Sequence, residues 1–278
     1  MRIAVVAPSS CFDDEAQVRE TERRVRHVAA EHHPGADIVF HDQCADQAGH
    51  FAGADDVRAA ALVAVANDPA YDAIWFARGG YGSNRIAERA LAGFDAAARR
   101  KKWLGYSDAG FLLAGLYREG YAGLAHGPMP KDALRADGAE AVKRALDWLV
   151  DGSRAALAEE VDRERPNLAF NITVFGMLLG TPLQPPLAGH VLMLEDVDEH
   201  LYATDRAMFH ITRNAAVREV AGIRRGRIAV KADRDQRPFG ETAQAIFERW
   251  CGEAGIALLG TADIGHDSDN KIVPFGRL

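Results

Sequence analysis

The chain has 278 residues, of which 48% are hydrophobic and 26% are charged, as is typical of a globular protein with one large domain or two ordinary ones. Its formal net charge of −7 excludes most nucleic-acid-binding and anionic-membrane-binding proteins, because no long cluster of Lys and Arg offsets that charge. The three cysteines are far apart and form no C-x-x-C pair. This argues against structural disulfides and a zinc site, and it fits a reducing compartment.

The N-terminal apolar run is too short for the core of a signal peptide, and no stretch approaches the length of a membrane span. We therefore expect a cytoplasmic protein with neither a membrane nor a nucleic acid as its partner. No residue pattern makes a convincing metal site, and we expect no metal ion and no other cofactor.

Short apolar runs alternate with segments of helical periodicity in the first half of the chain. We expect buried strands at residues 2–7, 37–41, 71–77 and 102–106. Helices are predicted at residues 13–32 and 55–66, after the loop 78–82, and from residue 108 onward. In the first helix, one face carries Val18, Thr21, Val25, Val28 and Ala29. This order predicts an α/β fold with a parallel sheet covered on both faces, whose site lies beyond the carboxyl ends of the strands.

A charged, weakly periodic segment then divides the chain. It follows a turn-rich stretch at residues 123–132 and an amphipathic helix at 139–150, and it ends at Pro166. We therefore expect a first domain at residues 1–150, a linker at 151–166 and a second α/β domain at 167–278. In the second domain we expect helices at 167–179, 199–214 and 240–254, and strands at 190–195, 227–231 and 256–260.

Ser107 lies at the turn between the strand at 102–106 and the helix that follows. Such a turn exposes the hydroxyl at the carboxyl edge of the sheet, near backbone N–H groups that can receive an oxyanion. The ordinary structural explanation is an N-cap serine followed by an acid in the first helical turn. The choice between the two depends on the rest of the chain.

The loop Arg78-Gly79-Gly80-Tyr81-Gly82 reaches the same edge of the sheet. It matches neither common phosphate-binding fingerprint, which disfavours nucleotide binding. Consecutive glycines let the backbone approach a ligand and donate N–H groups to an oxyanion, although a simple tight turn also explains them. Arg78 suits either a charged group of the substrate or a structural salt bridge.

Glu195 ends a predicted strand, and His266 follows the last predicted strand. Alone, each residue is more often structural. Together with Ser107 they supply the parts of a hydrolase triad: a nucleophile, a base, and a carboxylate that orients the base. His126, in the turn-rich stretch, is the only serious rival of His266.

These residues belong to a series of short motifs. In chain order the motifs are Ala7-Pro8-Ser9-Ser10, Arg78-Gly79-Gly80-Tyr81-Gly82, Gly105-Tyr106-Ser107-Asp108, His126-Gly127-Pro128-Met129, Gly180-Thr181-Pro182, Leu194-Glu195-Asp196-Val197, Gly265-His266 and Pro274-Phe275-Gly276. Nearly from end to end, the series resembles the LD-carboxypeptidase family, the muramoyltetrapeptide carboxypeptidases and the related microcin self-immunity peptidases. One segment departs from that pattern, since Ala169-Phe170-Asn171-Ile172 stands where the family usually has Gly-Gly-Asn-Leu.

For the site, the resemblance implies a serine peptidase triad formed by Ser107, Glu195 and His266. Its oxyanion donors would be backbone N–H groups near Gly80 and Asp108. Motif position alone favours Glu195 over the acids at positions 196 and 199.

For the fold, the resemblance implies a flavodoxin-like first domain, a smaller second domain, an active site in the cleft between them, and a homodimer. For the activity, it implies metal-independent hydrolysis of an L,D-bond of a small peptide, releasing D-alanine from a murein tetrapeptide during cytoplasmic cell-wall recycling. Three alternatives remain. They are cleavage of a peptidyl-nucleotide antibiotic, an α/β-hydrolase esterase (residues 105–109 nearly match G-x-S-x-G), and a non-catalytic small-ligand binding protein.

Overall fold

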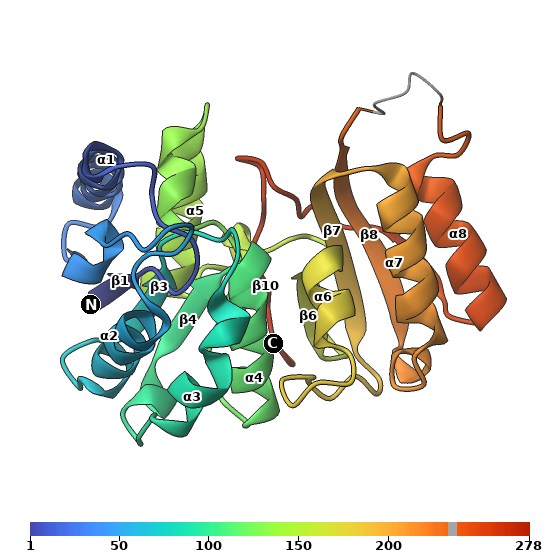
Figure 1. Ribbon diagram of the computed structural model, residues 1–278, viewed down its shortest axis with the longest axis horizontal. Coiled ribbons are helices and arrows are strands. Elements are labelled where there is room, and N and C mark those ends of the chain that lie inside the picture. Colours follow the sequence, from blue (N-terminus) through green and yellow to red (C-terminus); the bar gives the residue numbers. More distant parts are fainter. Residues whose placement is uncertain (233–237) are drawn as a thin grey trace.

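The computed structural model describes residues 1–232 and 238–278, which form two sheets with helices packed against them (Figure 1). Within these residues the first sheet has six strands in the order β10-β5-β4-β3-β1-β2, and the second has four in the order β6-β7-β8-β9. Neighbouring strands are parallel, except that β10 runs antiparallel to β5. The predicted α/β fold is confirmed, and the order β2-β1-β3-β4-β5 is that of flavodoxin.

The strands of the first sheet are β1 (Arg2–Val6), β2 (Asp37–Phe40), β3 (Ala73–Phe76), β4 (Lys102–Gly105), β5 (Leu124–His126) and β10 (Val273–Pro274). Its helices are α1 (Glu15–His32), α2 (Asp55–Asn67), α3 (Ala87–Ala92), α4 (Gly110–Arg118) and α5 (Gly138–Asp151). The second sheet and its helices are β6 (Asn167–Asn171), α6 (Ile172–Leu178), β7 (Val191–Glu199), α7 (Leu201–Arg213), β8 (Gly222–Val230), α8 (Ala243–Ala254) and β9 (Leu258–Thr261).

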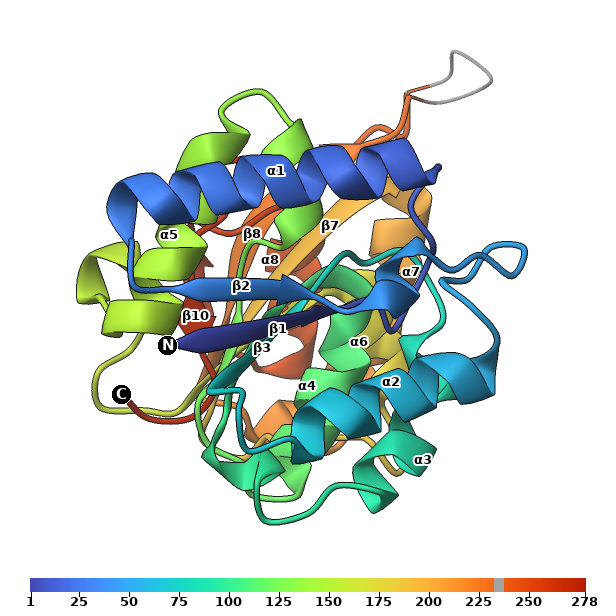
Figure 2. The same cartoon turned by 90° about the vertical axis from the view of Figure 1, so that its left-hand side faces the viewer.

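Alternate side chains of β1 enter two different cores. Ile3 and Val5 pack with residues of α1 and α5, whereas Ala4 and Val6 pack with residues of α2, α3 and α4. Figure 2 shows α1 and α5 on one side of the sheet and α2, α3 and α4 on the other. Strands buried on both faces are continuously apolar, and this is the pattern that predicted them.

The helix α1 forms where its periodicity predicts it. All five residues expected on its apolar face are buried, and the Asp14 carboxylate caps the helix by accepting a hydrogen bond from the backbone N–H of Gln17 at 2.7 Å. No helix in the described residues combines the length and the apolar character needed to cross a membrane.

Two sequence predictions are wrong. Residues 167–179 are expected to be one helix, but Asn167–Asn171 forms the strand β6, and α6 begins only at Ile172. Residues 123–132 are expected to be turns, but they contain β5. The physical reason is the same in both places, because a strand of three to five residues that is fully buried shows no alternation and cannot be told from a buried helix or a loop.

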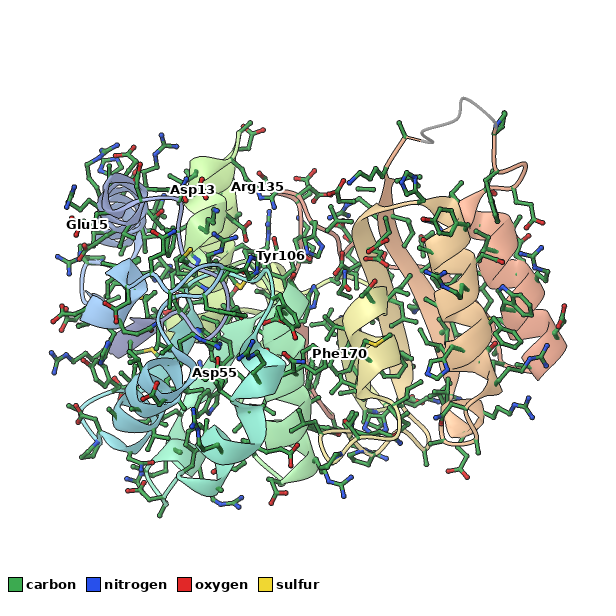
Figure 3. All side chains as sticks on the ribbon, in the orientation of Figure 1. Asp13, Glu15, Asp55, Tyr106, Arg135 and Phe170 are labelled. Atoms are coloured by element: carbon green, nitrogen blue, oxygen red, sulfur yellow. The ribbon has the colours of Figure 1, made fainter. Side chains whose placement is uncertain are left out.

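The two halves contribute to one hydrophobic core, which includes Phe170. Its ring stacks on Phe175 with centroids 5.3 Å apart and meets the edge of Phe275 at 5.2 Å. A Cβ on Gly110 of α4 would lie 3.2 Å from the Phe170 ring, so the two halves touch here (Figure 3). The domain boundaries stay a prediction.

Candidate active site

Ser107 lies in a short turn between β4 and α4, at the carboxyl edge of the first sheet. Its φ is +59°, a left-handed conformation that is uncommon for a residue with a side chain. A sharp strand-to-helix turn of this kind lifts a hydroxyl away from the backbone. Gly79 leaves the space for it, since a Cβ at Gly79 would lie 2.8 Å from both Cβ and Oγ of Ser107.

Asp108 fixes the turn that carries Ser107. Its buried carboxylate accepts hydrogen bonds from the Ser9 hydroxyl at 2.6 Å and from the backbone N–H of Ser83 at 2.8 Å. The Ser83 hydroxyl in turn donates to the Asp108 carbonyl at 2.6 Å. Burial raises the pKa of Asp108, while these hydrogen bonds oppose the rise. One carboxylate thereby holds together the loops that follow β1, β3 and β4.

Gly80 is held in a similar way from the loop after β1. Its φ is +105°, and the Ser10 side chain fills the space that a Cβ on Gly80 would need. The Ser10 hydroxyl accepts a hydrogen bond from the backbone N–H of Tyr81 at 3.0 Å and lies 2.6 Å from Nε2 of His50. The two glycines before Tyr81 therefore have little freedom to move.

Glu195 and His266 form a buried acid–base pair in the second half of the chain. His266 Nδ1 lies 2.5 Å from Glu195 Oε2, and the Glu195 side chain is fully buried. Because Nδ1 faces the carboxylate, we assign the proton to Nδ1, which leaves Nε2 as the basic nitrogen. Burial alone lowers the pKa of His266, but the charge of Glu195 and its hydrogen bond outweigh this, and the net pKa is raised.

A bulge in the second sheet directs Glu195. The register between β7 and β8 shifts between Leu194 and Asp196, so that Glu195 faces an extra stretch of β8. Gly226 lies in that stretch, and a Cβ there would come within 2.8 Å of the Glu195 Cβ. The absence of a side chain at Gly226 is therefore what makes room for the acid.

Asp196 and His126, the alternatives to Glu195 and His266, contact other residues. Asp196 accepts a hydrogen bond from Asn171 Nδ2 at 2.8 Å, and burial followed by the charge of Glu195 raises the pKa of Asp196 to about 6. His126 is buried next to Asn270, and burial lowers its pKa to about 3. Among the described acids, Glu195 is the one that is hydrogen-bonded to His266.

Ser107 and His266 both line a pocket of about 460 Å³ with walls from both halves of the chain. The Tyr106 ring packs 4.8 Å from the His266 ring, and Tyr106 lies at the junction of the halves in Figure 3. Gly79, Gly80 and Arg78 line the same pocket. Within the described residues, Ser107 and His266 share this pocket without a hydrogen bond between their side chains.

Three polar residues of this pocket are not among the site residues predicted from the sequence. Lys131, Asp132 and Arg135 follow β5, one of the strands that were not predicted. Asp132 accepts hydrogen bonds from Tyr106 Oη at 3.0 Å and Arg135 Nε at 2.8 Å, and Arg135 also donates to the His266 carbonyl at 2.8 Å. Recognising residues 124–126 as a strand would have placed the next loop at the carboxyl edge.

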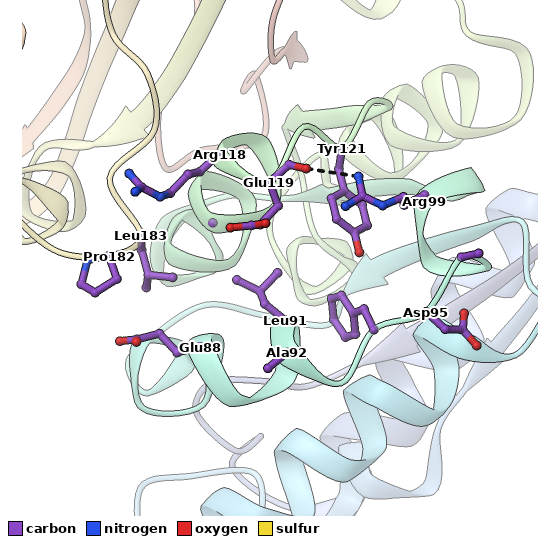
Figure 4. A pocket seen from close by; sticks show the side chains of 13 residues that line it. Glu88, Leu91, Ala92, Asp95, Arg99, Arg118, Glu119, Tyr121, Pro182 and Leu183 are labelled. Carbon is purple, nitrogen blue, oxygen red and sulfur yellow. Dashed lines mark hydrogen bonds between the residues drawn. The ribbon is translucent and has the colours of Figure 1, made fainter.

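A larger pocket, of about 570 Å³, lies between α3, α4 and the segment at Leu183 (Figure 4). Arg99 borders it and donates a hydrogen bond to the Glu119 carbonyl at 3.1 Å. None of the residues that line this pocket is a serine, cysteine or histidine. It therefore offers no nucleophile with a neighbouring base.

One trio of described residues, His33, Asp147 and Asp151, brings its ligand atoms within 4.8 Å of one another. The two ring nitrogens of His33 face different carboxylates, Nε2 that of Asp147 at 2.9 Å and Nδ1 that of Asp151 at 3.6 Å. Lys143 also pairs with Asp147, at 2.7 Å. This arrangement fits a polar junction between α1 and α5 better than a metal centre, because one ion reaches only one nitrogen of the ring.

Comparison with known proteins covers almost the whole chain. Family models described as the LD-carboxypeptidase N-terminal domain and C-terminal domain match residues 3–127 and 168–278. A putative carboxypeptidase of Streptomyces coelicolor is 32% identical over 243 residues, covering 83% of this chain and 75% of that protein. The murein tetrapeptide carboxypeptidase of Pseudomonas aeruginosa is 24% identical over 293 residues, covering 99% of this chain and 91% of that protein.

Solved structures share the fold over the same length. The muramoyltetrapeptide carboxypeptidase of Oxalobacter formigenes matches with a TM-score of 0.79 at 20% identity, covering 99% of this chain and 93% of that one. The microcin C7 self immunity protein MccF, in complex with aspartyl sulfamoyl adenosine, also has a TM-score of 0.79, at 17% identity, covering 99% of this chain and 91% of that one. With matches to both domains and along the full length, this chain belongs to the LD-carboxypeptidase family.

Proposed function

We propose that this chain is a serine carboxypeptidase that hydrolyses an L,D-peptide bond and releases D-alanine from murein tetrapeptide. Ser107 is the nucleophile, His266 the general base, and Glu195 the carboxylate that orients the base. The observation that carries the proposal is the Glu195–His266 contact of 2.5 Å in a pocket that Ser107 also lines.

The proposed reaction needs only groups of the chain and water. Ser107 Oγ attacks the scissile carbonyl carbon while His266 Nε2 accepts the hydroxyl proton. The tetrahedral intermediate collapses, the C–N bond breaks, and His266 passes that proton to the leaving amine. A water molecule, deprotonated by His266, then hydrolyses the Ser107 ester. Glu195 keeps the imidazole in the required tautomer and stabilises its charged form.

The oxyanion of the intermediate would be held by backbone N–H groups of Gly80 and Asp108. Asp108 N lies in the first turn after β4, where backbone N–H groups have no partner within a helix. Gly79 keeps the approach open, because the position of its missing Cβ is 3.5 Å from Asp108 N. The hydrogen bonds of Asp108 and Ser10 hold these donors in place before substrate binds, and this preorganisation is the main source of oxyanion stabilisation.

The substrate class is supported by the likeness to the murein tetrapeptide carboxypeptidase of Pseudomonas aeruginosa. Cleavage of a peptidyl-nucleotide conjugate is the second candidate, supported by the likeness to MccF bound to aspartyl sulfamoyl adenosine. Family membership argues against the α/β-hydrolase esterase alternative, and turnover itself would exclude a pure binding protein.

The test measures D-alanine release from L,D-tetrapeptide and, in parallel, cleavage of an aspartyl sulfamoyl nucleoside. We expect wild type to release D-alanine, and Ser107→Ala to lose activity by about 10⁴-fold or more, because the triad acts as a unit. Ser153→Ala, a change of a half-buried serine whose side chain has no hydrogen bond to another described residue, is the matched control and should retain full activity. Equal turnover by wild type and Ser107→Ala would refute the nucleophile assignment.

The homodimer and the cytoplasmic location also remain proposals. Light scattering coupled to size exclusion tests the first, and fractionation of cells that produce the protein tests the second.

A further inference from the structure

Three basic side chains line the Ser107 pocket, and they differ in how their charges are compensated. Arg135 is paired with Asp132 at 2.8 Å. In the described part of the chain, Arg78 has no carboxylate within 4.0 Å, and Lys131 reaches only Asp13, at 3.9 Å with an Asp13 side chain that is 73% exposed. The pocket therefore holds two cations that the chain itself leaves almost unpaired.

Arg78 and Lys131 are held close to each other beside the glycine loop. The Arg78 guanidinium carbon is 5.9 Å and the Lys131 Nζ is 5.8 Å from the centre of the buried Phe12 ring. The backbone N–H of Lys131 donates to the carbonyl of Ala77, the residue before Arg78, at 3.0 Å. Arg78 Nη2 lies 3.6 Å from the position that a Cβ of Gly80 would take. The cations thus lie alongside the backbone proposed to bind the oxyanion.

This arrangement is unfavourable without an anion. Burial lowers the pKa of both side chains, and the charge of Arg78 lowers the pKa of Lys131 further; the charge of the exposed Asp13 opposes this, but the net pKa of both remains lowered. Arg78 spends part of its hydrogen-bonding capacity on the Cys11 and Gly79 carbonyls, which are neutral acceptors. A carboxylate between the two cations would relieve their repulsion and accept charge-assisted hydrogen bonds from the guanidinium.

A carboxypeptidase substrate brings a carboxylate to this place. In the C-terminal residue, only the amide nitrogen and the Cα separate the scissile carbonyl carbon from the terminal carboxylate carbon, so the two carbons are within about 4 Å. Whatever recognises the terminal carboxylate must therefore share the pocket of the nucleophile, as Arg78 and Lys131 do.

We infer that Arg78 and Lys131 form the subsite for the free α-carboxylate of the leaving residue and restrict the enzyme to the C-terminal bond. The inference rests on the proposed peptidase function of the same pocket. It makes the two residues determinants of specificity, because a peptide that ends in a neutral amide, or continues beyond the leaving residue, brings no anion to the two cations.

The test compares L,D-tetrapeptide with the same peptide carrying a C-terminal carboxamide. For wild type we expect kcat/KM to be about 100-fold higher for the acid, the size of a charge-assisted hydrogen-bond loss. Arg78→Met should lower kcat/KM for the acid by about 100-fold, and Lys131→Met by about 10-fold, with the amide changed less than about threefold. Arg89→Met, at an exposed arginine of α3, is the control and should leave both values unchanged. Equal losses on acid and amide would overturn the subsite.

Two further experiments test the same subsite, one with a conservative variant and one by measuring binding. Arg78→Lys keeps the charge but not the planar fork, and it should lose about 10-fold on the acid alone if Arg78→Met fails to fold. Calorimetry with Ser107→Ala measures binding without turnover. The acid should bind more tightly than the amide, and this preference should vanish in Ser107→Ala/Arg78→Lys/Lys131→Met. Equal affinities, or no binding of the acid, would overturn the inference.

The two proposals fail differently. If wild type hydrolyses acid and amide equally, with Ser107 required, the peptidase stands and the carboxylate subsite falls. If Ser107→Ala prefers the acid but wild type hydrolyses neither peptide, the subsite stands and the proposed reaction falls.

Discussion

The two halves of the molecule position their candidate reacting groups by different means. In the first half, Ser107 occupies a left-handed turn that Asp108 ties to two other loops. In the second half, the bulge between β7 and β8 orients the Glu195 side chain, and the Glu195 carboxylate is hydrogen-bonded to His266. In both halves a glycine leaves room for the candidate reacting group: Gly79 for Ser107 and Gly226 for Glu195.

The two halves therefore meet different needs. The first holds a hydroxyl in a fixed position, and the second stabilises the charges of an acid–base pair. A hydroxyl needs exact placement but carries no charge at rest, and a network of neutral and charge-assisted hydrogen bonds supplies that placement. An acid–base pair needs a low-dielectric site in which each partner stabilises the charge of the other. Among the described residues, Glu195 Oε1 has no hydrogen-bond partner, so the buried carboxylate depends on the imidazole to offset its burial.

The largest expected effect in the second half is that of Glu195→Gln. We expect kcat to fall by about 10⁴-fold, because the amide no longer stabilises the imidazolium and can favour the wrong tautomer. Asp196→Asn changes the adjacent buried acid, whose partner is Asn171, and should cost less than about tenfold. Steady-state kinetics of D-alanine release checks both variants. Similar losses in both would mean that Glu195 has no special role.

A smaller effect is expected when the two glycines are changed. Gly79→Ala should lower kcat by about 100-fold, because a methyl group 2.8 Å from Ser107 Oγ must displace the hydroxyl. Gly226→Ala should lower kcat by a similar factor, but through the Glu195–His266 pair. Labelling by a fluorophosphonate, followed across pH, separates the two: Gly79→Ala slows labelling at every pH, whereas Gly226→Ala also moves its pH midpoint.

The controls for this comparison are glycines with open surroundings. Gly35→Ala in the first half and Gly252→Ala in the second add a methyl group with no atom within 4 Å. Both should keep full activity. A loss in either control equal to that of its partner would mean that the glycine effect is not local.

The smallest effect concerns the pH profile. His266 acts as a base only when it is neutral, so kcat/KM should rise as the pH passes through its pKa. Because Glu195 raises that pKa above the ordinary value of 6.5, the acidic limb should have its midpoint above pH 6.5. In Glu195→Gln burial acts without the opposing charge, and the midpoint of the residual activity should move down. An unchanged midpoint in this variant would show that a different group titrates.

The sequence by itself determined the alternating strands and helices of the first half, since strands buried on both faces and helices with one apolar face leave clear periods. It also singled out Ser107, Glu195 and His266 through their predicted places at strand ends and through ordered motifs, although β7 continues past Glu195 to Glu199. The hidden elements were β5, β6 and β10, which are too short or too deeply buried to show a period.

Only the tertiary structure decided which side chains meet. Glu195 and Asp196 are neighbours with the same charge, and it is the bulge opposite Gly226 that turns one toward His266 and leaves the other with Asn171. Lys131 became part of the pocket because β5 carries its loop to the edge where Arg78 lies. Contacts between residues far apart in the chain depend on which strands pair and how they pack, and the period of a single segment does not specify either.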